Sequence, residues 1–131
     1  MAINSVIFAG VVKAAKPLTT LGSGTAIGKF TLGVDDSYID KNKQMVMREF
    51  SIDVELWGAL CLKHKDDIVE GNKLVVLGKL KLESWTDTSG AKRYKHVVIA
   101  NQLEITGTPV PSLEDEVMKQ REHVLYEENP F

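Results

Sequence analysis

The chain has 131 residues, 44% hydrophobic and 26% charged, a composition typical of one globular domain with a modest additional segment. Its single cysteine excludes an intramolecular disulfide and a multi-cysteine zinc site, and no apolar run approaches the ~18 residues that a membrane-spanning helix needs. The net charge of −2 is uneven: residues 1–107 carry 14 Lys+Arg and 12 Asp+Glu, whereas residues 108–131 carry 2 and 6. This asymmetry predicts a polyanion-binding body and a partner-facing acidic tail.

The first half of the body predicts three strands. Residues 3–13 are apolar and β-branched, with Gly10 as the expected bulge or bend. Residues 26–34 and 50–56 alternate between apolar and polar side chains, as half-buried strands do. The polar, irregular segment 35–44 between them predicts a long hairpin loop.

The second half predicts one helix and two strands. Residues 59–69 place an apolar stripe at helical spacing, and Gly71 is the expected C-terminal cap. The stripe consists of Leu60, Cys61, His64 and Ile68. Strands follow at 74–85 and 92–105. Three strands, a short helix and two strands is the order of an all-β, five-stranded Greek-key barrel, the OB fold.

The body ends at two closely spaced prolines, Pro109 and Pro111, which cannot continue a central strand. We therefore expect an OB-fold domain at 1–107 and an acidic tail at 108–131. A capping-box-like start at Ser112 and apolar residues at helical spacing are compatible with a partly helical tail.

The strand predicted at 74–85 carries the clearest candidate binding surface. Its apolar residues should face the barrel interior: Leu74, Val76, Leu80 and Leu82. The other face combines charge with a large ring: Lys79, Lys81, Glu83 and Trp85. Such a face fits a platform on which bases stack beside a phosphate track, each stack contributing roughly 1–3 kcal/mol without reading sequence. The alternative is that Trp85 covers the barrel edge or fills an oligomer interface.

Three other aromatic residues differ in how far their positions favour stacking. Tyr38 stands at the start of the polar loop, where its ring either stacks on a passing strand or packs under the loop. Trp57 follows the polar phase of its strand, which predicts an outward ring unless a bulge reverses that phase. Phe50 shares the apolar phase, so periodicity alone assigns it to the core.

Further basic residues flank the same predicted sheet and are candidate phosphate contacts: Lys13, Lys16, Lys29, Arg48, Lys92, Arg93 and Lys95. Each contact would release counterions and make binding salt-dependent. The alternative for any one of them is a solvated surface charge.

Catalytic and metal-binding patterns are weak, so we expect no enzyme activity, no cofactor and no metal site. The three histidines lack ligand spacing with one another or with the cysteine. On the helix stripe, His64 and Cys61 are expected to be packed side chains. The only dense acidic cluster is Asp35, Asp36 and Asp40, for which a solvated loop tip is favoured over a cation site.

The last five residues join acidic side chains to a terminal ring: Glu127, Glu128, Asn129, Pro130 and Phe131. Burying the ring on a partner would contribute roughly 2 kcal/mol, and the carboxylates would steer the tip toward a basic surface. A frayed, solubilising end is the alternative. Behind a barrel with an outward tryptophan, the tip is predicted to bind a partner.

Several of these segments resemble the bacterial single-stranded DNA-binding protein family. The likeness runs in order through Asn4–Gly10, Leu56–Leu60, Glu70–Leu80 and Ser84–Gly90 with the following Arg93-Tyr94, and then the acidic Pro-Phe end. It covers about residues 3–105 and the last five. The tail is shorter than is typical of the family, which suggests a mobile-element or phage-like version.

The resemblance implies a homotetramer, with a dimer as the second option, that binds and protects single-stranded DNA during replication, recombination and repair. It puts Trp85 and Tyr38 at family stacking positions. It also puts Phe50 near such a position, which contradicts the assignment of Phe50 to the core. Trp57 falls where the family often has phenylalanine. It also implies that the tip recruits replication and repair proteins, and that the protein is cytoplasmic and nucleoid-associated. The alternative is an OB-fold protein-interaction subunit of a replication or primosome assembly.

Overall fold

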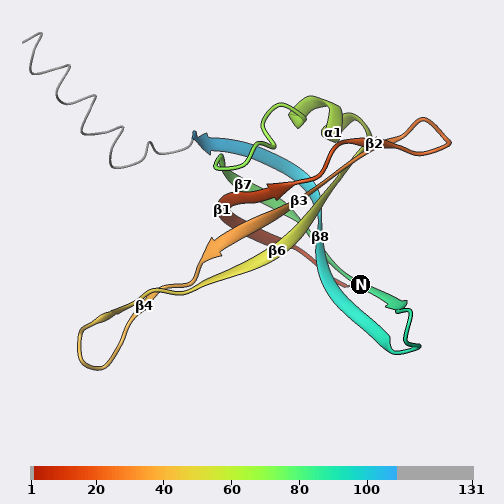
Figure 1. The fold of residues 1–131 in the computed structure, drawn as a ribbon. Helices are drawn as coiled ribbons and strands as arrows, with labels where there is room; N and C mark the ends of the chain where they lie inside the picture. Colours follow the sequence, from red (N-terminus) through yellow and green to blue (C-terminus); the bar gives the residue numbers. More distant parts are fainter. Residues whose placement is uncertain (1, 109–131) are drawn as a thin grey trace, which may run out of the picture.

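The computed structural model describes residues 2–108, in which five long strands form a barrel with one short helix at its end and two projecting hairpins (Figure 1). The long strands are β1 (Val6–Ala15), β3 (Ala26–Asp35), β6 (Glu49–Trp57), β7 (Lys73–Thr86) and β8 (Lys92–Gly107). No helix within these residues has the length and apolar character that a bilayer crossing demands. The tail and the predicted tip lie outside the described residues: Glu127, Glu128, Asn129, Pro130 and Phe131.

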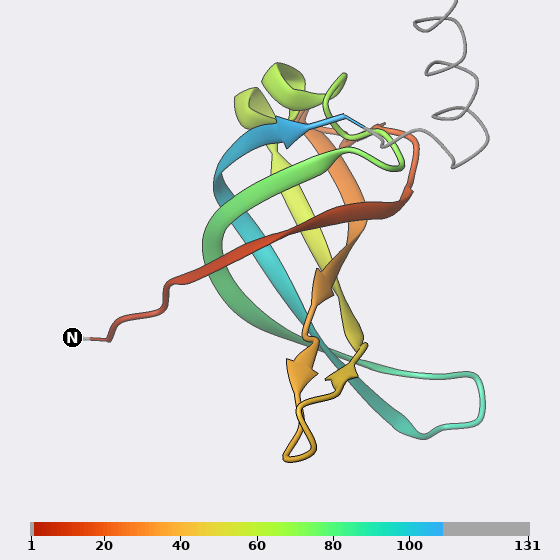
Figure 2. The ribbon, with the colours of Figure 1, turned by 90° about the vertical axis from the view of Figure 1, so that its left-hand side faces the viewer.

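The strands close in the OB-fold order that the sequence predicts. The sheet runs β1-β7-β8-β6-β3 and returns to β1, with the two-residue β2 (Thr19–Thr20) beside β3. All the pairs are antiparallel except β6 with β8, which is parallel. Figure 2 shows β1 lying across the other strands where the barrel closes.

Closure depends on a glycine in β1. A Cβ on Gly10 would collide with the backbone carbonyl of Gly33 in β3. Gly10 itself pairs regularly with Leu74, and the register shift in β1 lies between Val12 and Ala14 instead. Of the predicted bulge or bend at Gly10, the bulge is therefore wrong, because this glycine is required for close strand approach rather than for an extra residue.

The helix α1 (Gly58–His64) is shorter than predicted, and its C-cap is Lys65 rather than Gly71. It holds Leu60, Cys61 and His64 of the predicted stripe, whereas Ile68 packs against the core from the chain that follows the helix. Cys61 and His64 are buried, and burial raises the pKa of the Cys61 thiol. The helix ends at His64 because Asp67 turns the chain there. The Asp67 amide donates to the His64 carbonyl at 2.9 Å, and its carboxylate lies 2.9 Å from the His64 ring. Local bonding of this kind competes with helix continuation.

The predicted inward residues of β7 line the barrel interior, except at the end of that strand. Leu74 and Val76 are fully buried, and Leu80 packs partly against the core. Leu82 is 56% exposed, so its predicted inward position is wrong. The phase of β7 is unchanged there; the strand has left the barrel and pairs only with β8 as a projecting arm (Figure 1).

The segment predicted as a long hairpin loop is a hairpin with a short pair of strands. It contains β4 (Tyr38–Ile39) and β5 (Met45–Val46), antiparallel to each other. The Asp40 carboxylate stabilises the turn by accepting the amides of Asn42 and Gln44 at 2.8 and 3.0 Å. Period-2 alternation is too short in these two-residue strands to be recognised in the sequence.

Candidate nucleic-acid interface

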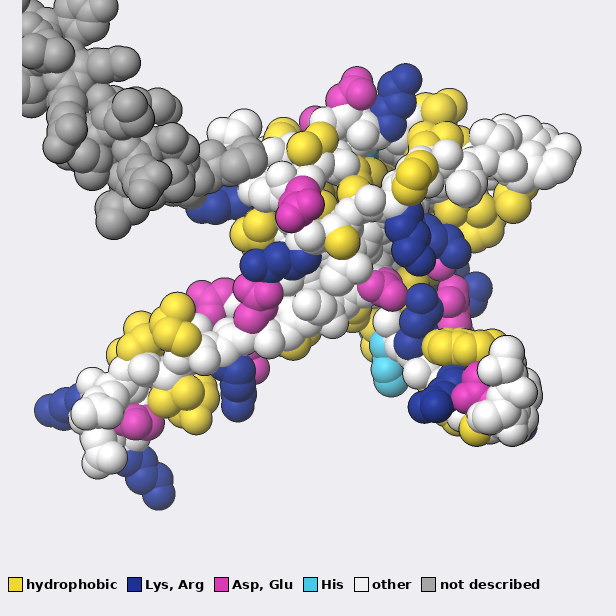
Figure 3. All heavy atoms as spheres, viewed as in Figure 1, with side chains coloured by type: hydrophobic (Ala, Val, Ile, Leu, Met, Phe, Trp, Pro, Cys, Tyr) yellow, Lys and Arg dark blue, Asp and Glu magenta, His cyan; other side chains and the backbone are white. Residues whose placement is uncertain are grey.

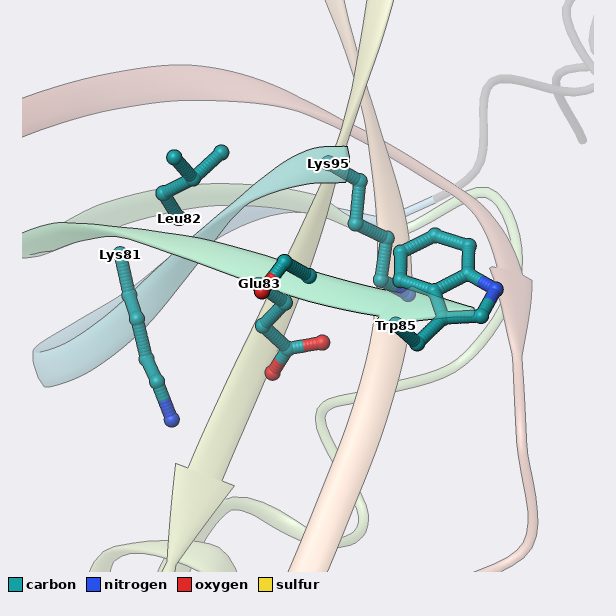
Figure 4. Close-up of a pocket in the computed structure, with 6 residues that line it drawn as sticks. Lys81, Leu82, Glu83, Trp85 and Lys95 are labelled. Carbon is teal, nitrogen blue, oxygen red and sulfur yellow. The ribbon is translucent and has the colours of Figure 1, made fainter. Parts of the chain in front are cut away.

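The β7–β8 arm displays Trp85 on an open, charged surface. The register pairs Trp85 with Arg93 and Glu83 with Lys95, so these four side chains share one face. The indole is 46% exposed and borders a groove of about 500 Å³ that Lys81 and Lys95 also line. Figure 4 shows Lys81 and Glu83 on the side of β7 opposite Leu82, and Lys95 beside the Trp85 ring.

The turn of this arm holds Arg93 in place. The Asp87 carboxylate accepts the Arg93 guanidinium at 2.8 Å and also bonds the Ser89 hydroxyl at 2.6 Å. Hydrogen bonds from Ser89, Arg93 and the Ala91 amide lower the pKa of the Asp87 carboxyl to about 2. The guanidinium opposite Trp85 is therefore positioned by an ionised carboxylate at all ordinary pH values.

The outer face of the barrel continues from this arm through Lys95. Lys95 Nζ lies 3.1 Å from Asp53 Oδ2 on β6, and Thr31 on β3 donates to Asp53 Oδ1 at 3.0 Å. Partial burial opposes ionisation of Asp53, but the bonds from Lys95 and Thr31 outweigh it and keep its pKa below the ordinary value. Three neighbouring strands are thus linked across the face.

A second, deeper hollow adjoins the first. It measures about 230 Å³ and is lined by three lysines, Lys16, Lys29 and Lys95, together with Asp53 and Glu55. Glu55 is almost fully buried and lies 3.8 Å from Lys29 Nζ. Lys95 lines both hollows. The face viewed in Figure 3 interleaves basic and acidic side chains.

The β4–β5 hairpin forms a separate candidate surface. Tyr38 is exposed, and the Arg48 guanidinium lies 5.0 Å from its ring centroid, a cation–π contact. Arg48 also pairs with Asp36 at 2.9 Å. Tyr38 therefore neither packs under the loop nor meets Trp85, since the two rings stand on different projections (Figure 1).

Phe50 and Trp57 lie at opposite ends and on opposite faces of β6. The β3–β6 pairing runs without a bulge, so the predicted outward phase of Trp57 is confirmed. Its indole donates to Glu55 at 3.3 Å. Phe50 keeps the inward phase but is 39% exposed, with its ring edge-on to Phe8 at 5.9 Å. Assigning Phe50 to the core is therefore wrong, because the barrel is open where this strand begins.

The predicted basic residues fall into separate groups. Lys16, Lys29 and Lys95 line the deeper hollow, whereas Lys13 pairs with Glu49 at 3.2 Å near the start of β6. The remaining residues are exposed on the two projections or on the β7 face: Lys79, Lys81, Lys92 and Arg93 with the β7–β8 arm, and Arg48 with the β4–β5 hairpin.

The sequence interpretation missed the acidic partners of this surface. Asp53 and Glu55 were recognised only as the polar phase of their strand. Their roles depend on register, which places Thr31 opposite Asp53 and Lys29 opposite Glu55. Opposite charges in the polar phases of two neighbouring strands indicate that cross-strand ion pairs can form. The 13-residue connection between these strands (36–48) does not fix their register, so the sequence does not tell which residues pair.

The acidic residues predicted to form a solvated loop tip stabilise the β4–β5 hairpin. Asp35 accepts the Ser37 amide at 2.8 Å, and hydrogen bonding by Ser37 lowers the pKa of its carboxyl. Asp36 pairs with Arg48, and Asp40 holds the turn. Among residues 2–108, no three His, Cys, Asp or Glu side chains are grouped as a metal site requires.

Comparison with known proteins decides the family. The model of the Single-strand binding protein family matches residues 3–106. This chain belongs to that family. A single-stranded DNA-binding protein of Wolinella succinogenes is 32% identical over 102 residues, covering 78% of this chain but only 63% of the relative. A protein of the same name from Aquifex aeolicus is 26% identical over 141 residues, covering 98% and 93%.

A solved structure agrees at the level of the fold. The Plasmodium falciparum SSB in complex with ssDNA has a TM-score of 0.73 and 15% identity, covering 82% of this chain and 97% of that one. At this identity the likeness concerns the OB fold of the single-strand binding family and not individual contacts.

Proposed function

We propose that this protein binds single-stranded DNA without strong sequence preference, as a non-enzymatic protein of replication, recombination and repair in the cytoplasm, at the nucleoid. The observation that carries the proposal is the exposed Trp85, paired with Arg93 beside a groove that Lys81 and Lys95 line. An indole among cations offers bases a stacking surface and phosphates a counter-charge. Family membership and the names of the relatives support it.

In this proposal the strand passes from the β7–β8 arm across the outer barrel face toward the β4–β5 hairpin. Trp85 and Tyr38 stack on bases at the two ends of the path. Trp57 contributes on the outer face of β6, and Phe50 contributes at the open end of the barrel, where β6 begins beside the β4–β5 hairpin. Phosphate contacts come from the surrounding basic residues: Lys13, Lys16, Lys29, Arg48, Lys79, Lys81, Lys92, Arg93 and Lys95.

A salt-series fluorescence titration with oligo(dT), and with duplex DNA as control, tests the proposal. Quenching of tryptophan emission by oligo(dT) is expected, with a salt slope of about 0.7 for each phosphate contact. Duplex should bind much more weakly. Weak, salt-insensitive binding of oligo(dT) would instead support a protein-interaction OB subunit, which the exposed apolar side chains of the hairpin favour: Ile39, Met45 and Met47.

We further propose a homo-oligomer, a tetramer rather than a dimer. Residues 6–10 of β1 pair with β7 on one edge, and no strand among residues 2–108 pairs with their other edge. Ile7 and Ile3 are strongly exposed beside it. Pairing of two copies along this edge would bury both the backbone groups and the isoleucines. This edge accounts for pairing in twos, and the tetramer is proposed from the family resemblance. Light scattering of the full chain should give four subunits.

The segment 108–131 acts in this proposal as a tail whose tip recruits replication and repair proteins. Its charge and its final residues support the idea: Glu127, Glu128, Asn129, Pro130 and Phe131. Removal of Phe131 should abolish capture of such a partner and leave oligo(dT) affinity unchanged. Loss of DNA affinity in the truncated chain would contradict the division into a binding domain, 1–107, and a tail.

A further inference from the structure

Two lysines on the outer barrel face are already engaged by carboxylates of the same chain. Lys95 on β8 reaches Asp53 on β6 at 3.1 Å, and Lys29 on β3 reaches Glu55 on β6 at 3.8 Å. Both carboxylates belong to residues that line the deeper hollow, together with the end of β1 and Lys95 of β8. The hollow therefore has three lysines but only one net positive charge.

The Asp53–Lys95 pair is accessible enough to exchange partners. The side chains are 43% and 41% exposed, in contrast to Glu55, which is 5% exposed. Ion pairs at such exposure are weak, so a phosphate approaching Lys95 competes with Asp53 on similar terms. If Lys95 moves to the phosphate, Asp53 loses that counter-charge and stands close to a second anion. Both consequences oppose binding.

We propose that Asp53 is a built-in competitor of the nucleic-acid backbone for Lys95, and that it lowers affinity for single-stranded DNA on the outer barrel face. The inference rests on the proposed function, since it concerns the regulation of that same surface. Thr31 keeps the carboxylate in place by bonding its other oxygen, so the competitor is held whether or not Lys95 is paired. Glu55 competes for Lys29 in the same way that Asp53 competes for Lys95, but from a more buried position.

A purely structural role for the pair makes the opposite prediction. If Asp53 only tied β6 to β8, its neutralisation would loosen the face and weaken DNA binding. Asn at this position has nearly the same shape and still accepts the Thr31 hydroxyl. Asp53→Asn thus removes the charge while retaining the bond to β3, which separates competition from architecture.

The experiment measures oligo(dT) binding across a salt series for the full chain and three variants. Asp53→Asn should bind about three- to tenfold more tightly at low salt, with a slope steeper by about 0.7 for each lysine released to a phosphate. Asp53→Asn with Lys95→Gln should lose this gain, because the gain operates through Lys95. Asp66→Asn, an exposed aspartate after α1, makes the same charge change away from the face and should change affinity by less than twofold.

The outcomes separate the inference from the function it rests on. Unchanged or weaker binding by Asp53→Asn, at an unaltered melting temperature, overturns the competitor role while the DNA-binding function stands. A gain in affinity that persists after Lys95→Gln also overturns it, since the gain would then come from the change in net charge and not from the release of Lys95. Failure of the unmodified chain to bind oligo(dT) removes both.

Discussion

The two projections of this protein present similar chemistry on different supports. Each carries an exposed aromatic ring near an arginine that a carboxylate holds: Trp85 with Arg93, and Tyr38 with Arg48. The β7–β8 arm is the continuation of two long barrel strands, paired without interruption from Gly78 to the turn. The β4–β5 hairpin has only two pairs of strand residues and depends on side-chain bonds at its turn.

This difference predicts unequal contributions to binding. A ring on an extended ladder is pre-organised, so little order is lost when a base stacks on it. A ring on a short hairpin must be ordered during binding, which offsets part of the stacking free energy. The arm should therefore dominate affinity, and the hairpin should adjust to the path of the strand.

The largest effect is expected at the arm. Trp85→Ala should weaken oligo(dT) binding by about 1–3 kcal/mol, roughly 5- to 150-fold. Tyr94→Ala serves as the control, because Tyr94 is an exposed ring in the opposite phase of β8. A filter-binding or anisotropy titration measures both. Equal losses in the two variants would show that the Trp85 face is not the binding face.

The second-largest difference is expected in the hydrogen exchange rates of backbone amides in the two projections. Amides of β4 and β5 are expected to exchange with deuterium at least tenfold faster than those of residues 79–85, a difference of about 1.4 kcal/mol in local opening. Native-state hydrogen exchange read by NMR provides the measurement, with the Val98 amide as the buried reference. Equal protection in both projections would contradict the claim that the β7–β8 arm is more ordered than the β4–β5 hairpin.

Tyr38→Ala should have a smaller effect than the tryptophan change. About 1 kcal/mol, or fivefold, is expected, at the lower limit for a stacked base. Tyr38→Phe keeps the ring and should restore most of the affinity, which distinguishes stacking from loss of the hydroxyl. If Tyr38→Ala costs more than Trp85→Ala in the same titration, the ranking of the two supports is reversed.

The smallest effect is expected when the pH is lowered and the Asp87 carboxyl is protonated. Because the pKa of Asp87 lies near 2, below its ordinary value of 3.8, its bonds favour the folded turn above about pH 4. That contribution is lost as the pH falls from about 4 toward 2, and Arg93 is then released. An NMR titration of the Asp87 carboxyl should show this low midpoint, and Ser89→Ala should raise it. A midpoint near 3.8 in the unmodified protein would mean that the turn does not hold Arg93 in solution.

The candidate binding surface was only partly predictable. The phase of β7 located Trp85, Lys79 and Lys81 correctly on one outward face, since alternation is a local property. Phe50 was misassigned because phase does not tell where a strand leaves the barrel. The partners of the lysines also escaped prediction, because Asp53 meets Lys95 only through the parallel pairing of β6 with β8.

The sequence by itself determined the strand order, the helix position and the alternating faces, because hydrophobic periodicity and turn residues act over a few neighbours. It also indicated the family and the split between a basic body and an acidic tail. Only the tertiary structure decided the closure at Gly10, the projection of β7 beyond Leu80, and the carboxylate partners of Lys29 and Lys95. These depend on register and close approach between residues distant in the chain, which local patterns do not specify.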